Sequence, residues 1–85
     1  MWFVYIIQHL LTKQIYIGVT RDIRRRLFEH NQGKTRATYR RNGKWILIYA
    51  EVYRDKRDAL LREQRLKYHG RAKQELLKRI RNSLL

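Results

Sequence analysis

The 85-residue sequence contains 21 Lys and Arg but only 7 Asp and Glu, which gives a formal net charge of +14. Cysteine is absent, which excludes a disulfide framework, a zinc knuckle and a thiol nucleophile, while a 44% hydrophobic content excludes a disordered basic tail. A chain of this length predicts one domain, residues 1–85, with one modest core.

The positive charge predicts a polyanionic partner. Repulsion among so many like charges costs stability unless a partner offsets it, and nucleic acid is the polyanion that suits a folded basic domain. Lys13 is the only Lys or Arg before Arg21, so the charge gathers in the later part of the chain. The apolar start is too short to span a bilayer and lacks the basic region of a signal peptide. We therefore expect a cytoplasmic protein with nucleic acid, and no membrane, as its partner.

Two alternating apolar segments predict a β-hairpin near the N-terminus. The segments are residues 2–8 (WFVYIIQ) and 15–20 (IYIGVT). A four-residue loop at Leu10–Lys13 places Tyr5 opposite Gly18 and on the same face as Tyr16. Either tyrosine alone is typical of a core aromatic, but two tyrosines beside a glycine leave open space, which is unusual for a face that only fills a core.

A helix over residues 23–31 is predicted directly after this hairpin. Asp22 can cap its start and Gly33 can end it. The side chains expected to face the core are Ile23, Leu27 and Phe28. Arg26 and His30 lie four residues apart and are therefore neighbours on one helical face. By themselves, this arginine is typical of a solvated charge and this histidine of a structural one.

The segment from Gln32 to Lys44 has no apolar period and is rich in hydrogen-bond donors, so it predicts a flexible loop that contacts phosphates. Such contacts suit a sugar-phosphate backbone. The nucleic-acid-binding residues expected in this loop and just before it are Gly18, Thr20, Arg25, Lys34, Arg36, Thr38, Arg40 and Arg41.

The rest of the chain predicts one strand and two helices. Residues 45–53 (WILIYAEVY) are nearly continuously apolar, which is typical of a strand covered on both faces. Asp55 can cap a helix over residues 56–69 that Gly70 stops, and residues 71–85 form a last amphipathic helix. Its apolar stripe is Leu76, Leu77, Ile80 and Leu84. The order β-β-α-β-α-α predicts an α/β chain of the α+β class, with a small three-stranded antiparallel sheet flanked by helices.

Glu63 is the least expected residue of the helix over 56–69. Ala59, Leu60 and Leu66 surround it on the stripe that should face the core. Burying an unpaired carboxylate is costly, so a partner is expected. In so basic a chain the ordinary partner is a nearby arginine. The functional alternative is a magnesium-type ion beside fixed cations, which is the arrangement that phosphodiester cleavage requires.

Together these residues resemble the GIY-YIG nuclease motif. VYII is followed eleven residues later by YIG, an Arg and a His follow on the first helix, and a Glu lies on the second, at spacings typical of that family's catalytic domain. Val4 replaces the glycine of the first triplet and Ile6 stands where the pattern continues with tyrosine. The resemblance covers nearly the whole chain and is nearest to small bacterial members that carry little besides this domain.

The resemblance implies an endonuclease that hydrolyses phosphodiester bonds in DNA, one strand at a time. It implies that Tyr5 or Tyr16 helps to activate the attacking water, that Arg26 holds the scissile phosphate, and that His30 assists proton transfer or phosphate binding. Glu63 would be the metal ligand, for Mg²⁺ or Mn²⁺. Because a tyrosine with a pKa of about 10 is a poor base, nearby cations or the metal are expected to push it toward ionisation.

A second class of function stays open, that of a non-catalytic basic protein that binds DNA or RNA and keeps the nuclease fold. Both classes predict binding that weakens steeply with salt, so only cleavage separates them.

For the nuclease, branched, nicked or single-stranded DNA, as met in DNA repair, is the expected substrate. A monomer or a weak homodimer is expected, and cleavage of both strands would require a dimer or two visits.

Overall fold

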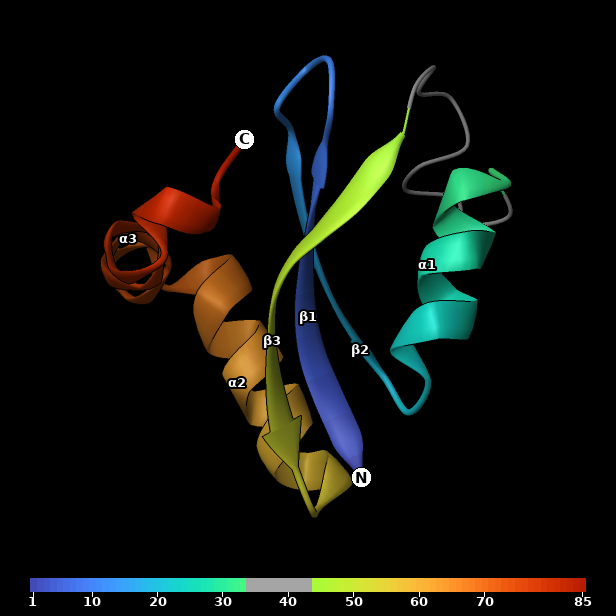
Figure 1. Cartoon of the computed structure of the whole chain (residues 1–85). Coiled ribbons are helices and arrows are strands. Elements are labelled where there is room, and N and C mark those ends of the chain that lie inside the picture. Colours follow the sequence, from blue (N-terminus) through green and yellow to red (C-terminus); the bar gives the residue numbers. More distant parts are fainter. Residues whose placement is uncertain (34–43) are drawn as a thin grey trace.

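The computed structural model describes residues 1–33 and 44–85. The elements are β1 (Trp2–His9), β2 (Ile15–Thr20), α1 (Ile23–Asn31), β3 (Trp45–Tyr53), α2 (Lys56–Tyr68), α3 (Gly70–Arg79) and a 3₁₀ turn at Arg81–Ser83 (Figure 1). The predicted element order and α+β class are confirmed. None of the helices in the described part of the chain is long and apolar enough to cross a membrane.

β1 is the central strand of an antiparallel sheet with the order β2-β1-β3. Tyr5 pairs with Gly18, and Ile7 pairs with Tyr16, which confirms the predicted register of the hairpin. Residues directly opposite each other point to the same side of a sheet. Tyr5, Gly18 and Tyr16 therefore share one face.

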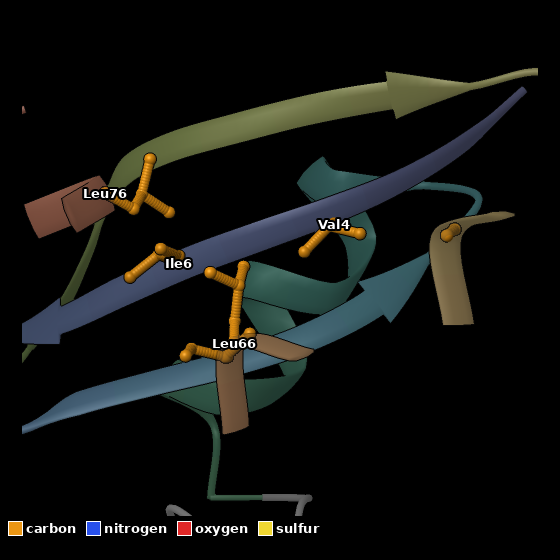
Figure 2. Packing of buried hydrophobic residues seen from close by; sticks show 6 residues of the cluster. Val4, Ile6, Leu66 and Leu76 are labelled. Atoms are coloured by element: carbon orange, nitrogen blue, oxygen red, sulfur yellow. The ribbon is translucent and has the colours of Figure 1, made fainter. Parts of the chain in front are cut away.

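Different helices cover the two faces of the sheet, with α1 on one side and α2 and α3 on the other (Figure 1). The buried cluster under α2 and α3 consists of Val4, Ile6, Ile17, Ala59, Leu66 and Leu76 (Figure 2). The cluster under α1 consists of Tyr5, Ile7 and Trp45, with Tyr16, Ile23 and Leu27 packed against it. Because side chains alternate along β1, this one strand supplies both clusters.

Hydrogen bonds fix α1 at both ends. The Asp22 carboxylate accepts from the backbone N–H of Arg25 at 3.0 Å and caps the first turn, as predicted. At the other end, Asn31 Oδ1 accepts from the Trp45 backbone N–H at 2.7 Å and its Nδ2 donates to the Trp45 carbonyl at 3.2 Å. These bonds hold α1 over β3 and β1. The edge strand β2 is consequently less covered on this face, and Tyr16 stays partly exposed.

Three predictions about burial are wrong. One is Leu60, expected on the core-facing stripe around Glu63, which is 38% exposed. Phe28 was expected in the core but is 57% exposed, because the stripe of Ile23, Leu27 and His30 faces the sheet and Phe28 lies around the helix from it. β3 was expected to be covered on both faces, yet Leu47 is 37% and Val52 is 53% exposed. β3 is an edge strand of this sheet, so the helices cover it less completely than they cover β1.

The C-terminal helix is shorter than predicted. It begins at Gly70 and ends at Arg79 instead of running over 71–85. The chain leaves the helical conformation at Ile80, and the Leu85 backbone N–H then donates to Gln8 Oε1 of β1 at 2.8 Å. A continuous helix would carry this end away from the sheet, so the bond to Gln8 and the shortened helix belong together.

Gly18 is required by the packing of Tyr5. A Cβ atom at position 18 would lie 2.6 Å from Tyr5 Oη and 2.7 Å from Tyr5 Cζ. Both distances are far inside van der Waals contact, so the Tyr5 ring occupies the space that a side chain would need. The glycine therefore allows the tyrosine of the neighbouring strand to lie flat across β2.

Gly18→Ala should displace the Tyr5 ring and destabilise the protein by about 1–3 kcal/mol, the usual effect of overpacking a buried site. Urea unfolding of the variant and the wild type measures this difference.

Gly70→Ala is the matched control, because a Cβ there would meet nothing within 4 Å. Ala is the better helix former, so this variant should be neutral or more stable by up to about 1 kcal/mol. Equal effects of the two substitutions would show that Tyr5 does not depend on the absence of a side chain at Gly18.

Candidate active site

A hydrogen bond between Tyr5 of β1 and His30 of α1 forms the centre of the site. The Tyr5 hydroxyl and His30 Nε2 are 2.7 Å apart, and each residue is 1% exposed. The sequence brings them together because Tyr5 points to the α1 face and His30 lies on the inner stripe of α1. Two residues 25 positions apart thus form one buried polar pair.

Tyr16 completes a cluster of three aromatic rings. Its ring centroid lies 4.8 Å from that of His30 and 6.2 Å from that of Tyr5. Tyr16 is only partly buried, since it stands at the start of the edge strand β2. Of the two motif tyrosines, Tyr16 is therefore the one that solvent and a ligand can reach.

Arg26 lies one helical turn before His30, and its charge acts on both tyrosines. Its Nη1 forms an ion pair with Glu29 Oε1 at 3.0 Å. Beside this pair is a hollow of about 290 Å³, which is open to solvent. The residues that line it are Trp2, Val19, Thr20, Arg21, Arg25, Arg26 and Glu29. Three arginines and one glutamate make this hollow suitable for an anion.

The nearby cations do not by themselves favour the phenolate of Tyr5. Burial raises the pKa of Tyr5 well above its usual value, and Tyr16 raises it further. The Arg26 guanidinium acts in the opposite direction but does not overcome these effects. Tyr5 in the chain alone is consequently a neutral phenol at physiological pH. The expectation that nearby cations or the metal push a tyrosine toward ionisation stays a prediction.

His30 is held in its neutral form. Burial lowers its pKa to about 4, and the positive charge of Arg26 adds to the effect, against a small opposing contribution from Glu29. A neutral imidazole beside a neutral phenol makes the Tyr5–His30 bond a bond between uncharged groups. Perturbed pKa values of this kind are frequent at functional sites.

Glu63 of α2 is partly buried, as expected, but its partner is not an arginine. Glu63 Oε2 forms an ion pair with Lys67 Nζ at 3.2 Å, one turn later on the same helix. Lys67 Nζ also lies 5.7 Å from the centroid of the Tyr16 ring. Lys67 thus connects the carboxylate of α2 to the aromatic cluster on the other side of β2.

The expected metal ligand has no cluster of further acidic ligands around it. Among the described residues, no group of three or more His, Cys, Asp and Glu could hold an ion. Glu63 offers one hard carboxylate, which suits an ion that keeps most of its water shell.

The expected nucleic-acid contacts occupy different kinds of position. Gly18 lies under the Tyr5 ring, and Arg25 lines the hollow beside Arg26. Thr20 is 7% exposed, and its Oγ1 accepts from the Asp22 backbone N–H at 3.1 Å and so belongs to the turn before α1. The remaining five lie outside the described residues: Lys34, Arg36, Thr38, Arg40 and Arg41.

Sequence reasoning missed two partners of the expected site residues. Lys67 forms an ion pair with Glu63, and Glu29 forms one with Arg26. The signal was available, because Lys67 follows Glu63 by four residues and Glu29 follows Arg26 by three. Pairs at these spacings are neighbours on a helix surface. In a chain with so many cations, however, nothing distinguished Lys67 from the other lysines.

A family model described as the GIY-YIG catalytic domain matches residues 1–82, which includes all of these site residues. The chain belongs to the GIY-YIG family. Tyr5, Tyr16 and Gly18, which the resemblance assigns to the family's two motif triplets, lie on one face of the paired strands β1 and β2.

Relatives within the family carry names that state no activity. The UPF0213 protein of Desulfotalea psychrophila is 40% identical over 67 residues, which are 78% of this chain and 60% of that protein. The UPF0213 protein YhbQ of Escherichia coli is 33% identical over 76 residues, which are 89% of this chain and 75% of that protein. The chain thus spans less than two thirds of the Desulfotalea relative.

The solution NMR structure of the UPF0213 protein BH0048 from Bacillus halodurans has the same fold. It is 30% identical to this chain with a TM-score of 0.56, and the match covers 94% of this chain and 85% of that one. This agreement confirms the predicted three-stranded sheet with flanking helices.

His30 should make the free energy of unfolding depend on pH. Its pKa is about 4 in the folded chain against 6.5 for an ordinary histidine. Between these two pH values the unfolded state binds more protons, so stability falls as the pH is lowered, by at most about 1.4 kcal/mol per pH unit from this group. Urea unfolding across this range measures the slope.

His30→Gln should flatten that slope, whereas the matched control His69→Gln, at an exposed position, should keep it. The ring protons of His30 should also titrate near pH 4 in an NMR experiment. Titration of His30 near its ordinary pKa would contradict the neutral buried imidazole.

Glu29→Gln should strengthen the binding of short DNA by about two- to fivefold. Half-exposed ion pairs are worth at most about 1 kcal/mol, and removing this one frees the Arg26 guanidinium for phosphate. Fluorescence anisotropy in the presence of chelator measures the affinity.

Glu75→Gln is the control, because it removes the same charge from an exposed pair with Arg71 on α3. An equal gain in both variants would mean that Glu29 acts only through net charge.

Proposed function

We propose that this protein is a divalent-metal-dependent endonuclease that hydrolyses DNA one strand at a time. The observation that carries the proposal is the buried Tyr5–His30 hydrogen bond, with Tyr16 and Arg26 beside it. A protein that only binds phosphate requires surface cations. A buried pair of neutral groups with strongly shifted pKa values, next to a partly exposed tyrosine and a fixed guanidinium, instead suits a framework that positions the reacting groups.

Arg26 binds the scissile phosphate in this proposal. A guanidinium offers several donors in a rigid fork, which matches two phosphate oxygens and the charge that develops in the transition state. The phosphate replaces Glu29 as the partner of Arg26, which is already oriented by the 3.0 Å ion pair on the same helix.

Tyr16 is the tyrosine that contacts the attacking water, since it is the more exposed of the two. Tyr5 and His30 stay neutral, and their buried hydrogen bond fixes the aromatic cluster against which Tyr16 packs. His30 is able to accept a proton at physiological pH because it is unprotonated there. Its pKa of about 4 makes it a weak base, so its main contribution is to orient the Tyr5 hydroxyl.

Glu63 would hold the metal ion. Mg²⁺ is commonly bound by one or two carboxylates and substrate phosphates and keeps several waters, which fits a single partly buried glutamate. When bound, the ion would stabilise negative charge on the phosphate and the leaving oxygen. Lys67, the present partner of Glu63, must then share the carboxylate or move toward the Tyr16 ring, which is 5.7 Å from its ammonium.

The second candidate is a basic DNA- or RNA-binding protein that has this fold without catalysis. The observation that favours it is the Glu63–Lys67 pair, because an internal cation already satisfies the one carboxylate that a metal would use.

For the nuclease we propose nicked, branched or single-stranded DNA as substrate, DNA repair as its process, the cytoplasm as its location, and a monomer or weak homodimer as its state. The net charge of +14 supports a nucleic-acid substrate, and the absence of cysteine suits a reducing compartment such as the cytoplasm.

Cleavage assays with Glu63→Gln and Arg26→Ala test the proposal. Labelled single-stranded, duplex, flap and four-way DNA are incubated with Mg²⁺, Mn²⁺ or chelator. The wild type should cut only with metal, and each substitution should lower the rate at least about 100-fold, as for loss of a group that stabilises transition-state charge. Binding in chelator should change far less for Glu63→Gln.

Glu75→Gln again serves as the control and should cut like the wild type. Equal scission by all variants would identify a contaminating nuclease. Tight binding without scission on any substrate would overturn the nuclease proposal in favour of the binding protein.

A further inference from the structure

Trp2 brings together two cations from distant parts of the chain. The Arg21 guanidinium carbon lies 5.3 Å and Lys56 Nζ lies 4.9 Å from the centre of the Trp2 ring. Trp2 begins β1, Arg21 follows β2 and Lys56 begins α2. These three element ends lie at the end of the sheet where the N-terminus lies (Figure 1).

These two cations have no carboxylate partner. All seven Asp and Glu residues belong to the described part of the chain. The ion pairs among described residues are Arg26–Glu29, Arg57–Asp55, Arg62–Glu51, Lys67–Glu63 and Arg71–Glu75. Arg21 and Lys56 appear in none of them. An aromatic ring attracts cations but does not cancel their mutual repulsion, so an anion bound between them would relieve it.

Trp2 and Arg21 connect this group of cations to the candidate active site. Trp2 and Arg21 line the same hollow of about 290 Å³ that Arg25, Arg26 and Glu29 line from α1. A nucleic-acid strand with one phosphate at Arg26 therefore has its next phosphates beside a second group of cations.

The chemistry of this place favours phosphate over a base. The Trp2 ring is partly buried against the core cluster under α2 and α3 and carries the two cations, so little of it is free for stacking. A base would have to displace a cation from the ring. A phosphate instead adds to the arrangement, because it pairs with the cations that the ring already holds in place.

We propose that Trp2, Arg21 and Lys56 form a clamp for the phosphate that flanks the scissile one on the same DNA strand. The position of the scissile phosphate rests on the proposed function, whereas the clamp itself requires only that the ligand is nucleic acid. Arg21 contacts the phosphate from the edge of the hollow, Lys56 contacts it from the start of α2, and Trp2 is a positioning residue that holds both cations. Because the clamp contacts one backbone, a single strand is sufficient to fill it.

Salt-dependent binding tests the clamp in the full chain. The affinity for a short single-stranded oligonucleotide is measured in chelator over a range of KCl concentrations. The double variant Arg21→Gln/Lys56→Gln should lower the slope of log affinity against log salt by about 0.7, the amount for one lost phosphate contact on a single strand, and each single substitution should lower it by less. Arg81→Gln is the control, since it removes an exposed arginine from the turn after α3 and should leave the slope nearly unchanged.

Trp2 is tested separately from its contribution to folding. Trp2→Leu should weaken binding about two- to fivefold, the range of a cation–π interaction, and Trp2→Phe should restore most of it. In a chain that already carries Arg21→Gln and Lys56→Gln, Trp2→Leu should have no further effect. An equal loss in both backgrounds would overturn the positioning role.

A strand without bases separates phosphate binding from stacking. An oligonucleotide with abasic sites beside the central phosphate should bind as tightly as the normal strand, and a Trp2-dependent loss of affinity would overturn the clamp. A slope unchanged by Arg21→Gln and Lys56→Gln would also overturn it. Since every measurement is made in chelator, failure of cleavage leaves the clamp standing. If the wild type binds normally and the variants bind with the same affinity and salt slope, the clamp is rejected but the proposed nuclease function is not.

Discussion

The packing of the Tyr5 ring across Gly18, with its hydroxyl bonded to the buried His30, is the constraint on which the site depends. The ring fills the space above Gly18, and the 2.7 Å bond joins β1 to α1. This bond and the anchoring of Asn31 to Trp45 hold α1 over the central and third strands. The edge strand β2 is left partly open as a result. Tyr16 is partly exposed near its start, and the hollow beside Arg26 lies at its end, where Val19 and Thr20 line it.

The distribution of carboxylates controls the electrostatics of this surface. With seven acidic residues against 21 basic ones, each ion pair decides which cations are free for an anion. Glu29 engages Arg26 and Glu63 engages Lys67, so both expected site charges already have partners before a substrate arrives. The cations on Trp2 have none. Binding of nucleic acid would therefore involve both exchange of partners at Arg26 and filling of a place that has no internal counter-charge.

Burial determines the charge state of the two groups at the centre of the site. Tyr5 lies below the surface, where the loss of solvation outweighs the charge of Arg26 and raises its pKa. The same burial lowers the pKa of His30. The exposed Tyr16 is thus left as the tyrosine that meets the attacking water in the proposed mechanism. The division between a buried and an exposed tyrosine follows from the strand order, with β1 in the centre and β2 at the edge.

Alternating and helical periodicity in the sequence determined the element order, the Tyr5–Gly18 register and the Asp22 cap, because these depend on neighbours within a few residues. The resemblance to the GIY-YIG motif supplied the five expected site positions, which stay predictions. The tertiary structure alone decided which groups they contact: the burial of His30, the exposure of Phe28, the lysine partner of Glu63, and the meeting of Arg21 and Lys56 on Trp2. The reason is physical. Local spacing tells which side chains share a face, whereas solvation, pKa and ion pairing depend on which faces the fold brings together.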